Sequence, residues 1–341
     1  MGRMQPSPLP GAHALPEGLR LRNFAGDADF PRMAVVANAS FAADGIASVR
    51  RPDDMRRDYA AMTRWDPARD IMMAERHGEL AGYARTFDWT TAEGTLVQGQ
   101  IAFVHPDHRR HGVGTALLRW IESRQREIAR QRSDANAWQH QAIVTEGERE
   151  RAQLLEKAGY RVQRYFLEME RATMEAIPDF PLPEGLEVRP VQPQHLRAIF
   201  DAHMEALKDH WGYSPPRPDD FELWKKSRTC QPHLWQVAWD VRTNQVAGQV
   251  KPWIDAEQNE TQGRRRGYTE FISVGREWRR RGLARALVVR ALRAQKEVGM
   301  EESALGVDGE SAFGAARLYE ACGFVVVKRN AMYRKAVDPG A

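Results

Sequence analysis

The alternation of hydrophobic and polar residues divides the chain into two series of elements in the same order. Each series predicts a short strand (19–24; 186–191) and then a helical region (about 28–42; 193–210). A three-stranded meander follows, at 71–76, 80–88 and 97–104 and again at 234–240, 245–253 and 267–275. Each series closes with a long helix (112–130; 282–298), a strand (137–144; 303–307), a helix (148–158; 311–322) and a hairpin (160–170; 324–336). This order predicts an α/β fold with a mixed sheet in each half.

The long helices carry apolar residues at helical spacing, which predicts one buried face on each. In the first these residues are Val113, Leu117, Trp120, Ile121 and Ile128, and in the second Ala284, Leu287, Val288, Ala291 and Val298.

The order of elements repeats because segments of the sequence repeat. LRLR at 19–22 matches LEVR at 186–189, and LAGY at 80–83 matches VAGQ at 246–249. The segments that start at 100 and 270, and those that start at 152 and 316, also match, so the four offsets are 167, 166, 170 and 164. Matches in one order at nearly constant offset indicate a tandem duplication. We therefore expect a flexible arm at 1–17, one domain at 18–172, an exposed proline-containing linker at 173–184 and a second domain at 185–338.

Composition excludes disordered and fibrous proteins. Of 341 residues, 42% are hydrophobic and 28% are charged, as in globular chains. Lysine and arginine exceed aspartate and glutamate by 50 − 46 = 4. An excess this small over this length does not indicate a nucleic-acid partner.

Cysteine, histidine and apolar runs exclude several other classes. Two cysteines, Cys230 and Cys322, cannot form a disulfide framework, which favours a reducing cytoplasm. The ten histidines show no metal-binding spacing, so no metal is expected. No apolar run approaches the roughly 20 residues that cross a bilayer, so no membrane association is expected either.

The most informative segments join the third meander strand to the long helix. They read Arg109-Arg110-His111-Gly112-Val113-Gly114 and Arg279-Arg280-Arg281-Gly282-Leu283-Ala284. Free amides and partial positive charge at a helix N-terminus favour a bound phosphate. Small residues let a ligand approach the backbone, and arginine adds charge-assisted contacts. A single such turn could merely cap a helix, but two copies in the same context predict phosphate-binding loops.

Here the sequence resembles the GCN5-related N-acetyltransferase (GNAT) family. The motif R-x-x-G-x-G/A after a strand carries the resemblance, together with a later helix that ends in Leu-Tyr-Glu-x-x-Gly-Phe (318–324). Both halves match, and the tandem layout is similar to mycothiol synthase. The resemblance implies two acyl-CoA N-acyltransferase domains. It also implies acetyl-CoA as acyl donor, in a gap between the last meander strand and the next parallel strand.

The resemblance implies cofactor-binding residues in both halves. Those of the first half are Ala102, Phe103, Val104, Arg109, Arg110, His111, Gly112, Val113, Gly114 and Thr115. Those of the second half are Ile272, Ser273, Val274, Arg279, Arg280, Arg281, Gly282, Leu283, Ala284, Arg285 and Ser311. Ser311 stands where the family often has asparagine, which puts its contact in doubt.

Two positions predict that the second half is catalytic. Tyr319 matches the family's proton donor, and the first half has Leu155 there. Glu270 can accept a proton directly or through water, and the first half has Gln100 there. The alternatives are a packed aromatic ring for Tyr319 and a solvated strand residue for Glu270. We expect the first half to be structural or to bind cofactor without turnover.

The acceptor is expected to be the primary amine of a small molecule, attacked directly on the thioester. His210, Trp211 and Tyr213 are candidates for its site, although Trp211 and Trp224 could instead be packing residues. Arg264, Arg265 and Arg266 are predicted at an exposed hairpin tip.

Two other functions stay open. One is that of a mycothiol synthase proper, whose acceptor is a cysteinyl-glucosaminyl-inositol amine. The other is that of a non-catalytic acyl-CoA-binding or regulatory protein. A tandem chain can bury its own domain interface, which favours a monomer, with a homodimer as the alternative.

Overall fold

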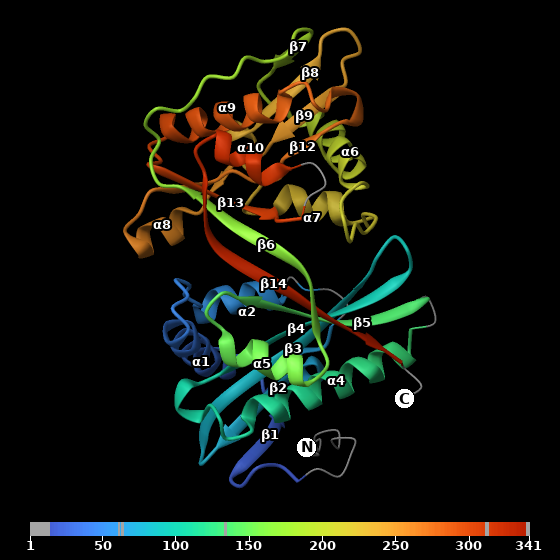
Figure 1. Cartoon of the computed structure of the whole chain (residues 1–341), viewed down its shortest axis with the longest axis vertical. Helices are drawn as coiled ribbons and strands as arrows, with labels where there is room; N and C mark the ends of the chain where they lie inside the picture. Colours follow the sequence, from blue (N-terminus) through green and yellow to red (C-terminus); the bar gives the residue numbers. More distant parts are fainter. Residues whose placement is uncertain (1–13, 61, 63–64, 133–134, 311–313, 339–341) are drawn as a thin grey trace. The chain divides into compact units, whose positions relative to one another are not determined.

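The computed structural model describes residues 14–60, 62, 65–132, 135–310 and 314–338. They form two compact units, whose elements are labelled in Figure 1. The first unit contains the described residues up to Gln163 together with those from Asn330 onward, and the second is Arg164–Arg329. The predicted arm at 1–17 lies mostly outside the described residues.

The first unit is a mixed sheet with helices on both faces. Its strands are β1 (Leu19–Asn23), β2 (Ile71–Arg76), β3 (Glu79–Thr90), β4 (Thr95–Val104) and β5 (Ala137–Thr145). Its helices are α1 (Asp29–Ala43), α2 (Pro52–Ala60), α3 (Pro67–Asp70), α4 (Val113–Arg130) and α5 (Arg149–Lys157). Strands β1 to β4 pair antiparallel, and β4 and β5 pair parallel. The predicted α/β fold is confirmed in this unit.

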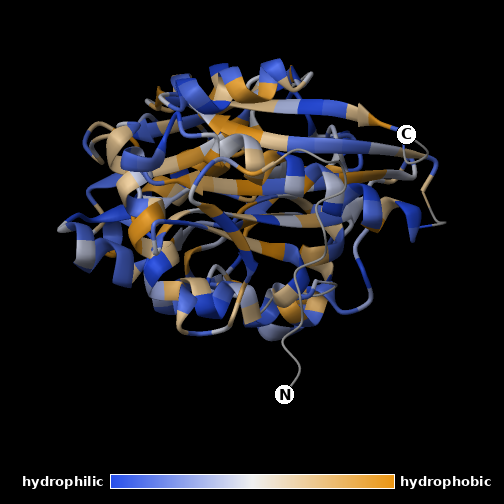
Figure 2. Cartoon of the chain, turned by 90° about the horizontal axis from the view of Figure 1, so that it is seen from below, coloured by the Kyte–Doolittle hydropathy of each residue, from blue (hydrophilic) through white to orange (hydrophobic). Residues whose placement is uncertain are grey.

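The continuous apolar run of β2 follows from burial on both faces of the sheet. Ile71 and Met73 pack in a cluster with residues of α1, and Met72 and Ala74 pack in a cluster with residues of α4. A strand covered on both sides needs no polar face. Figure 2 shows the hydrophobic residues gathered on the central strands, with hydrophilic residues on the outer helix faces and loops.

The second unit repeats the arrangement with shorter strands. Its strands are β7 (Leu186–Val188), β8 (Gln236–Asp240), β9 (Val246–Val250), β10 (Trp253–Ile254), β11 (Arg266–Tyr268), β12 (Ser273–Val274) and β13 (Glu302–Asp308). Its helices are α6 (Leu196–Leu207), α7 (Asp220–Lys226), α8 (Ala256–Gln262), α9 (Leu283–Glu297) and α10 (Ala315–Ala321). One sheet has the order β12-β9-β8-β7, and β11 pairs with both β10 and β13.

The strand predicted at 267–275 is interrupted. β11 ends at Tyr268, β12 begins at Ser273, and Phe271 between them has a φ of 51°. A left-handed conformation in a bulky residue breaks the pleat of a strand. The corresponding β4 of the first unit runs unbroken from Thr95 to Val104.

The predicted final hairpins are wrong, because each is one long strand. These are β6 (Arg161–Arg171) and β14 (Val325–Val337). In the second unit β6 pairs with β13, from Phe166↔Asp308 to Arg171↔Ser303. In the first unit β14 pairs with β5, from Asn330↔Thr145 to Val337↔Trp138. The last strand of each sequence half therefore completes the unit of the other half, and the compact units cross the repeat boundaries.

The described segments before β1 and β7 pack against the cores of their units. Leu15 packs against the core of the first unit, and Met174 is buried in the core of the second. In the predicted linker, Phe180 lies 4.7 Å below the Arg285 guanidinium. Ile177, Phe180 and Leu182 of the predicted linker are half-buried, because they pack against the core cluster that contains α9.

Two smaller predictions are also corrected. Arg264 and Arg266 are not at a free hairpin tip, because both form ion pairs with Glu302. Val298 is 47% exposed, because α9 ends at Glu297 and its C-cap residue leaves the buried face.

Candidate active site

The parallel strands of each unit separate before the loop that leads to the long helix. In the first unit, pairing between β4 and β5 ends at Gln100↔Ala142, although β4 continues to Val104. In the second, pairing between β11 and β13 ends at Tyr268↔Ala304, and β12 pairs with β9. Separated parallel strands leave backbone groups that can bind a ligand, so each unit has the predicted gap.

The two predicted phosphate loops have the same backbone. Arg110 and Arg280 have φ of 63° and 61°, and Gly112 and Gly282 have φ of 78° and 83°. Each glycine is the N-cap of its long helix, α4 or α9. Glycine tolerates this conformation, which turns successive N–H groups toward one point. The loops are therefore suited to an anionic ligand.

The first arginine of each loop is already engaged by a carboxylate. The guanidinium of Arg109 donates to both carboxylate oxygens of Asp44, at 2.7 and 2.8 Å. Arg279 donates to Asp209 at 2.6 Å and to the carbonyl of Val274 at 3.1 Å. Both aspartates lie just after the first helix of their unit. These arginines therefore fix the loop to that helix.

The next arginines remain available for phosphate. The side chains of Arg110, Arg280 and Arg281 are exposed, and none forms an ion pair with a described residue. Arginine in such a position binds phosphate oxygens through several N–H groups.

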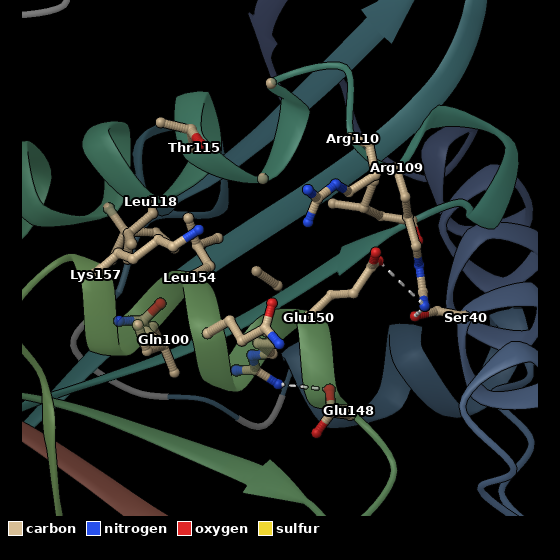
Figure 3. Close-up of a pocket in the computed structure, with 18 of the residues that line it drawn as sticks. Ser40, Gln100, Arg109, Arg110, Thr115, Leu118, Glu148, Glu150, Leu154 and Lys157 are labelled. Carbon is tan, nitrogen blue, oxygen red and sulfur yellow. Dashed lines mark hydrogen bonds and ion pairs between the residues drawn. The ribbon is translucent and has the colours of Figure 1, made fainter.

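The first unit contains a cavity of about 380 Å³ beside its loop. Figure 3 shows Arg110 at one end and Gln100 with the α5 residues Leu154 and Lys157 at the other. Glu150 on α5 lies 3.9 Å from the Arg109 guanidinium. A volume of this size suits a small ligand or part of a larger one.

Gln100 and Leu155 leave this cavity without a proton donor or acceptor of the predicted kind. The Gln100 amide donates to the hydroxyl of Tyr160 at 3.0 Å, deep in the unit. Leu155 is buried against α4. The tyrosine stands at different aligned positions in the two halves, since the first half has Leu155 and Tyr160 where the second has Tyr319 and Phe324.

Glu270 lies on the other side of its strand from the position that Gln100 occupies. Its neighbour Thr269 faces α9, where its hydroxyl accepts from Gln295 at 2.9 Å. The Glu270 carboxylate instead accepts from the indole of Trp253 at 3.0 Å. Burial raises the pKa of Glu270, and the Trp253 hydrogen bond acts in the opposite direction. Alignment of the two halves does not show this change of face.

Tyr319 lies on α10 and is 7% exposed. Its ring meets Phe324 edge-on at 6.3 Å, and burial raises the pKa of its hydroxyl. A neutral hydroxyl can donate a proton, so the second unit has both groups that the first lacks. Ser311 lies outside the described residues.

The candidate acceptor residues follow α6. His210 and Trp211 are exposed and Tyr213 is half-buried. The Trp211 ring lies 4.8 Å from the Arg164 guanidinium, whereas Trp224 packs on Trp235 at 5.3 Å. Trp224 is thus a packing residue, and Trp211 is not in the core.

Three polar groups of the second unit were not predicted. His203 contacts the Ser273 hydroxyl at 3.0 Å through Nδ1, and both are buried. Lys251 is buried among aromatic rings, and Trp253 contacts Glu270. Alignment of the halves offered one signal, because Lys251 corresponds to Arg85, which is also a cation on the middle meander strand.

Comparison with known proteins agrees with this geometry. The model of the acetyltransferase (GNAT) family matches residues 196–324, and that of an acetyltransferase (GNAT) domain matches residues 67–162. A mycothiol acetyltransferase of Kineococcus radiotolerans is 31% identical, over 94% of this chain and 95% of that protein. The chain belongs to the GNAT family of acetyltransferases. It is therefore an N-acetyltransferase with two tandem GNAT domains.

Solved structures show the same tandem GNAT fold. A GCN5-related N-acetyltransferase from Sphaerobacter thermophilus has a TM-score of 0.78 and 27% identity, over 96% of this chain and 98% of that one. A tandem GNAT protein from the clavulanic acid biosynthesis pathway has a TM-score of 0.66 and 16% identity, over 93% and 98%. The second likeness concerns the fold alone.

Two kinds of feature do not occur among the described residues. No helix in the described ranges is long and apolar enough to cross a membrane. No group of three or more His, Cys, Asp or Glu in those ranges is arranged to hold a metal ion.

Proposed function

We propose that the second unit transfers an acetyl group from acetyl-CoA to the primary amine of a small molecule by direct attack on the thioester. The observation that carries this proposal is the broken strand of the second unit. At this break the buried Glu270 carboxylate accepts a hydrogen bond from the Trp253 indole, and the pairing of β11 with β13 has ended at Tyr268. The first unit has a continuous strand and Gln100.

Both loops would suit the phosphates of the acyl donor. The amides at 280–285, with Arg280 and Arg281, would hold its pyrophosphate in the second unit. The amides at 110–115, with Arg110, would do so in the first. Bound acetyl-CoA would supply an activated acyl group, and the chain's residues supply position and proton transfer.

The chain's residues would then act at three atoms. The Glu270 carboxylate would accept a proton from the acceptor ammonium, directly or through water, because burial keeps its pKa raised. Backbone N–H groups at the strand break would donate to the developing oxyanion. The Tyr319 hydroxyl would protonate the departing sulfur. His210, Trp211 and Tyr213 would line the acceptor site.

The first unit would bind cofactor without turnover. Its cavity and loop are intact, but Leu155 cannot donate a proton and Gln100 is committed to Tyr160. It would thus serve the molecule as a structural partner.

Kinetics of two variants test the catalytic roles. Tyr319→Phe and Glu270→Gln are each expected to lower kcat about 100-fold, since general acid or base catalysis contributes at least this much. CoA release is measured with a panel of an amino sugar, a polyamine and an amino acid. Tyr165→Phe, at an exposed position of β6, is the matched control. Unchanged turnover in Tyr319→Phe would remove that residue from its role. Binding of acetyl-CoA with no turnover for any amine would favour the regulatory function.

A second candidate is the mycothiol acetyltransferase reaction. It is supported by the name of relatives such as those of Kineococcus radiotolerans and Saccharomonospora viridis, at 31% and 30% identity. The cysteinyl-glucosaminyl-inositol amine therefore belongs in the panel. A kcat/KM for it at least about tenfold above every other amine would select this reaction, and equal values would reject it.

A further inference from the structure

Trp253 is the one described side chain that hydrogen-bonds to the Glu270 carboxylate. Its indole Nε1 donates to Oε2 at 3.0 Å. Trp253 begins β10, and its backbone pairs with Tyr268 of β11 two residues before Glu270. The carboxylate is therefore held from the neighbouring strand rather than by its own backbone.

The indole itself is fixed from both directions. Its ring stacks on Tyr268 with centroids 4.4 Å apart and planes 15° apart. The Tyr268 hydroxyl donates to Gln258 on α8 at 2.6 Å, which in turn fixes the tyrosine ring. The Arg228 guanidinium lies 5.9 Å from the Trp253 ring. A donor held this firmly restricts the orientation of the group it binds.

The first half of the chain lacks both members of this pair. In the sequence, the repeat offset of 166 aligns Phe87 with Trp253, and the offset of 170 aligns Gln100 with Glu270. Phe87 has no N–H in its side chain, and its ring lies over Gly99. The Gln100 amide donates to Tyr160 instead. Carboxylate and indole donor thus occur together in one half and are both missing from the other.

We propose that Trp253 is a positioning residue, which orients the Glu270 carboxylate toward the acceptor amine through the indole N–H. This inference rests on the proposed role of Glu270 as base. Trp253 itself touches no reacting atom. A hydrogen bond to a carboxylate also favours its ionised form, so Trp253 keeps Glu270 ready to accept a proton at lower pH.

The other charged and titratable groups around the pair are few. Tyr268 lies on the same face of the strand, and Lys251 donates its backbone N–H to the Glu270 carbonyl at 3.0 Å. Arg228 lies over Trp253 and forms an ion pair with Asp255 at 3.1 Å. The side chains of these four residues form no hydrogen bond with the Glu270 carboxylate, so the Trp253 hydrogen bond is what opposes the effect of burial on the pKa of Glu270.

The test replaces Trp253 with the residue that the first half has. In Trp253→Phe the midpoint of the acidic limb of kcat/KM is expected to rise by about one pH unit, which corresponds to the loss of one charged hydrogen bond. At a pH below the midpoint the loss in kcat/KM is about tenfold. Trp89→Phe, on β3 of the first unit, is the matched control and leaves the profile in place. The acceptor used is the best amine of the panel.

A double-mutant cycle separates positioning from packing. Trp253→Phe in the background of Glu270→Gln is expected to add no further loss, because the group that it positions is gone. An equal loss in both backgrounds would overturn the inference and leave Trp253 a packing residue.

A direct titration keeps this result apart from the fate of the proposed function. The carboxyl of Glu270, followed by ¹³C NMR of glutamate-labelled protein and assigned with Glu270→Gln, is expected to titrate at higher pH in Trp253→Phe. If the Glu270 carboxyl titrated at the same pH in Trp253→Phe as in the wild type, the role of Trp253 would be rejected, whatever the kinetic result. Full activity of Glu270→Gln would instead reject Glu270 as base.

Discussion

At the scale of single residues, Lys251 is a cation that the fold places in an apolar environment. It is 1% exposed, and its Nζ lies 5.1 Å from the Trp224 ring centroid and 5.5 Å from that of Phe271. No described carboxylate forms an ion pair with it. Burial lowers its pKa to about 7. Aromatic faces attract an ammonium, but they replace only part of its hydration.

This environment predicts a dependence of stability on pH. Lys251 has a lowered pKa in the folded state, so between about pH 7 and its unfolded value of 10.5 the unfolded chain binds the extra proton. The free energy of unfolding then rises with pH, by on the order of 1 kcal/mol per pH unit. Below pH 7 both states are protonated, so Lys251 no longer makes the free energy of unfolding depend on pH.

The measurement is urea denaturation followed by circular dichroism at about pH 7.5 and about pH 9. Both values lie between the folded and unfolded pKa of Lys251. Lys251→Met is expected to remove the rise, and Lys296→Met, on the exposed face of α9, to retain it. His203 and Cys230 lie near Lys251 and are present in all three proteins, and the charge of Lys251 lowers the pKa of each of them. A rise that persists in Lys251→Met would show that another group causes it.

At the scale of elements, the loop before each long helix depends on its left-handed glycine. Gly282 has a φ of 83°, and the three atoms nearest to a Cβ added there would be side-chain atoms of Arg285, at 3.4 to 3.8 Å. The cost of a side chain at Gly282 is therefore conformational rather than steric. At Gly112 a Cβ would in addition lie 2.6 Å from Pro16.

Gly282→Ala is therefore expected to destabilise the second unit by about 1 kcal/mol and to weaken acetyl-CoA binding about tenfold, because the amides turn away from the phosphate. Calorimetric titration with acetyl-CoA measures the affinity. Gly306→Ala, on β13 with open space and no positive φ, is the matched control. If only Gly112→Ala abolished binding, the two units would exchange their assigned roles.

At the scale of the whole molecule, the two sequence halves exchange their last strands. Met332 of β14 pairs with Ile143 of β5 in the first unit, and Met169 of β6 pairs with Leu305 of β13 in the second. Both methionines are buried, at 4% and 0% exposure. Each unit thus needs residues from both halves of the sequence.

Cavities at these methionines are expected to act on the unit of the other half. Met332→Ala should cost about 2–5 kcal/mol and speed amide hydrogen exchange in β5, and Met169→Ala should do so in β13. Mass spectrometry of hydrogen exchange locates the change, and each variant is the control of the other. Faster exchange in β13 for Met332→Ala would contradict the strand pairing.

Much of the architecture could be predicted from the sequence because local signals determine it. The repeat offsets, the stripes of α4 and α9, and the glycines before both helices depend on residues close together in the chain. Helical and strand periods are short, so a window of one element contains them. The tandem α/β fold, the phosphate loops and the family followed from these signals.

The tertiary structure alone decided what depends on distant residues. Arg109 donates to Asp44, 65 residues earlier in the chain, so its guanidinium holds the loop to the first helix. Glu270 contacts Trp253 beside the break at Phe271, although its sequence aligns with an unbroken strand. The last strands pair across the repeat, where a local pattern predicts hairpins. The Arg109 guanidinium, the Glu270 carboxylate and the last strands each have more than one possible partner in the sequence. Only the packing of the folded chain determines which partner each of them contacts.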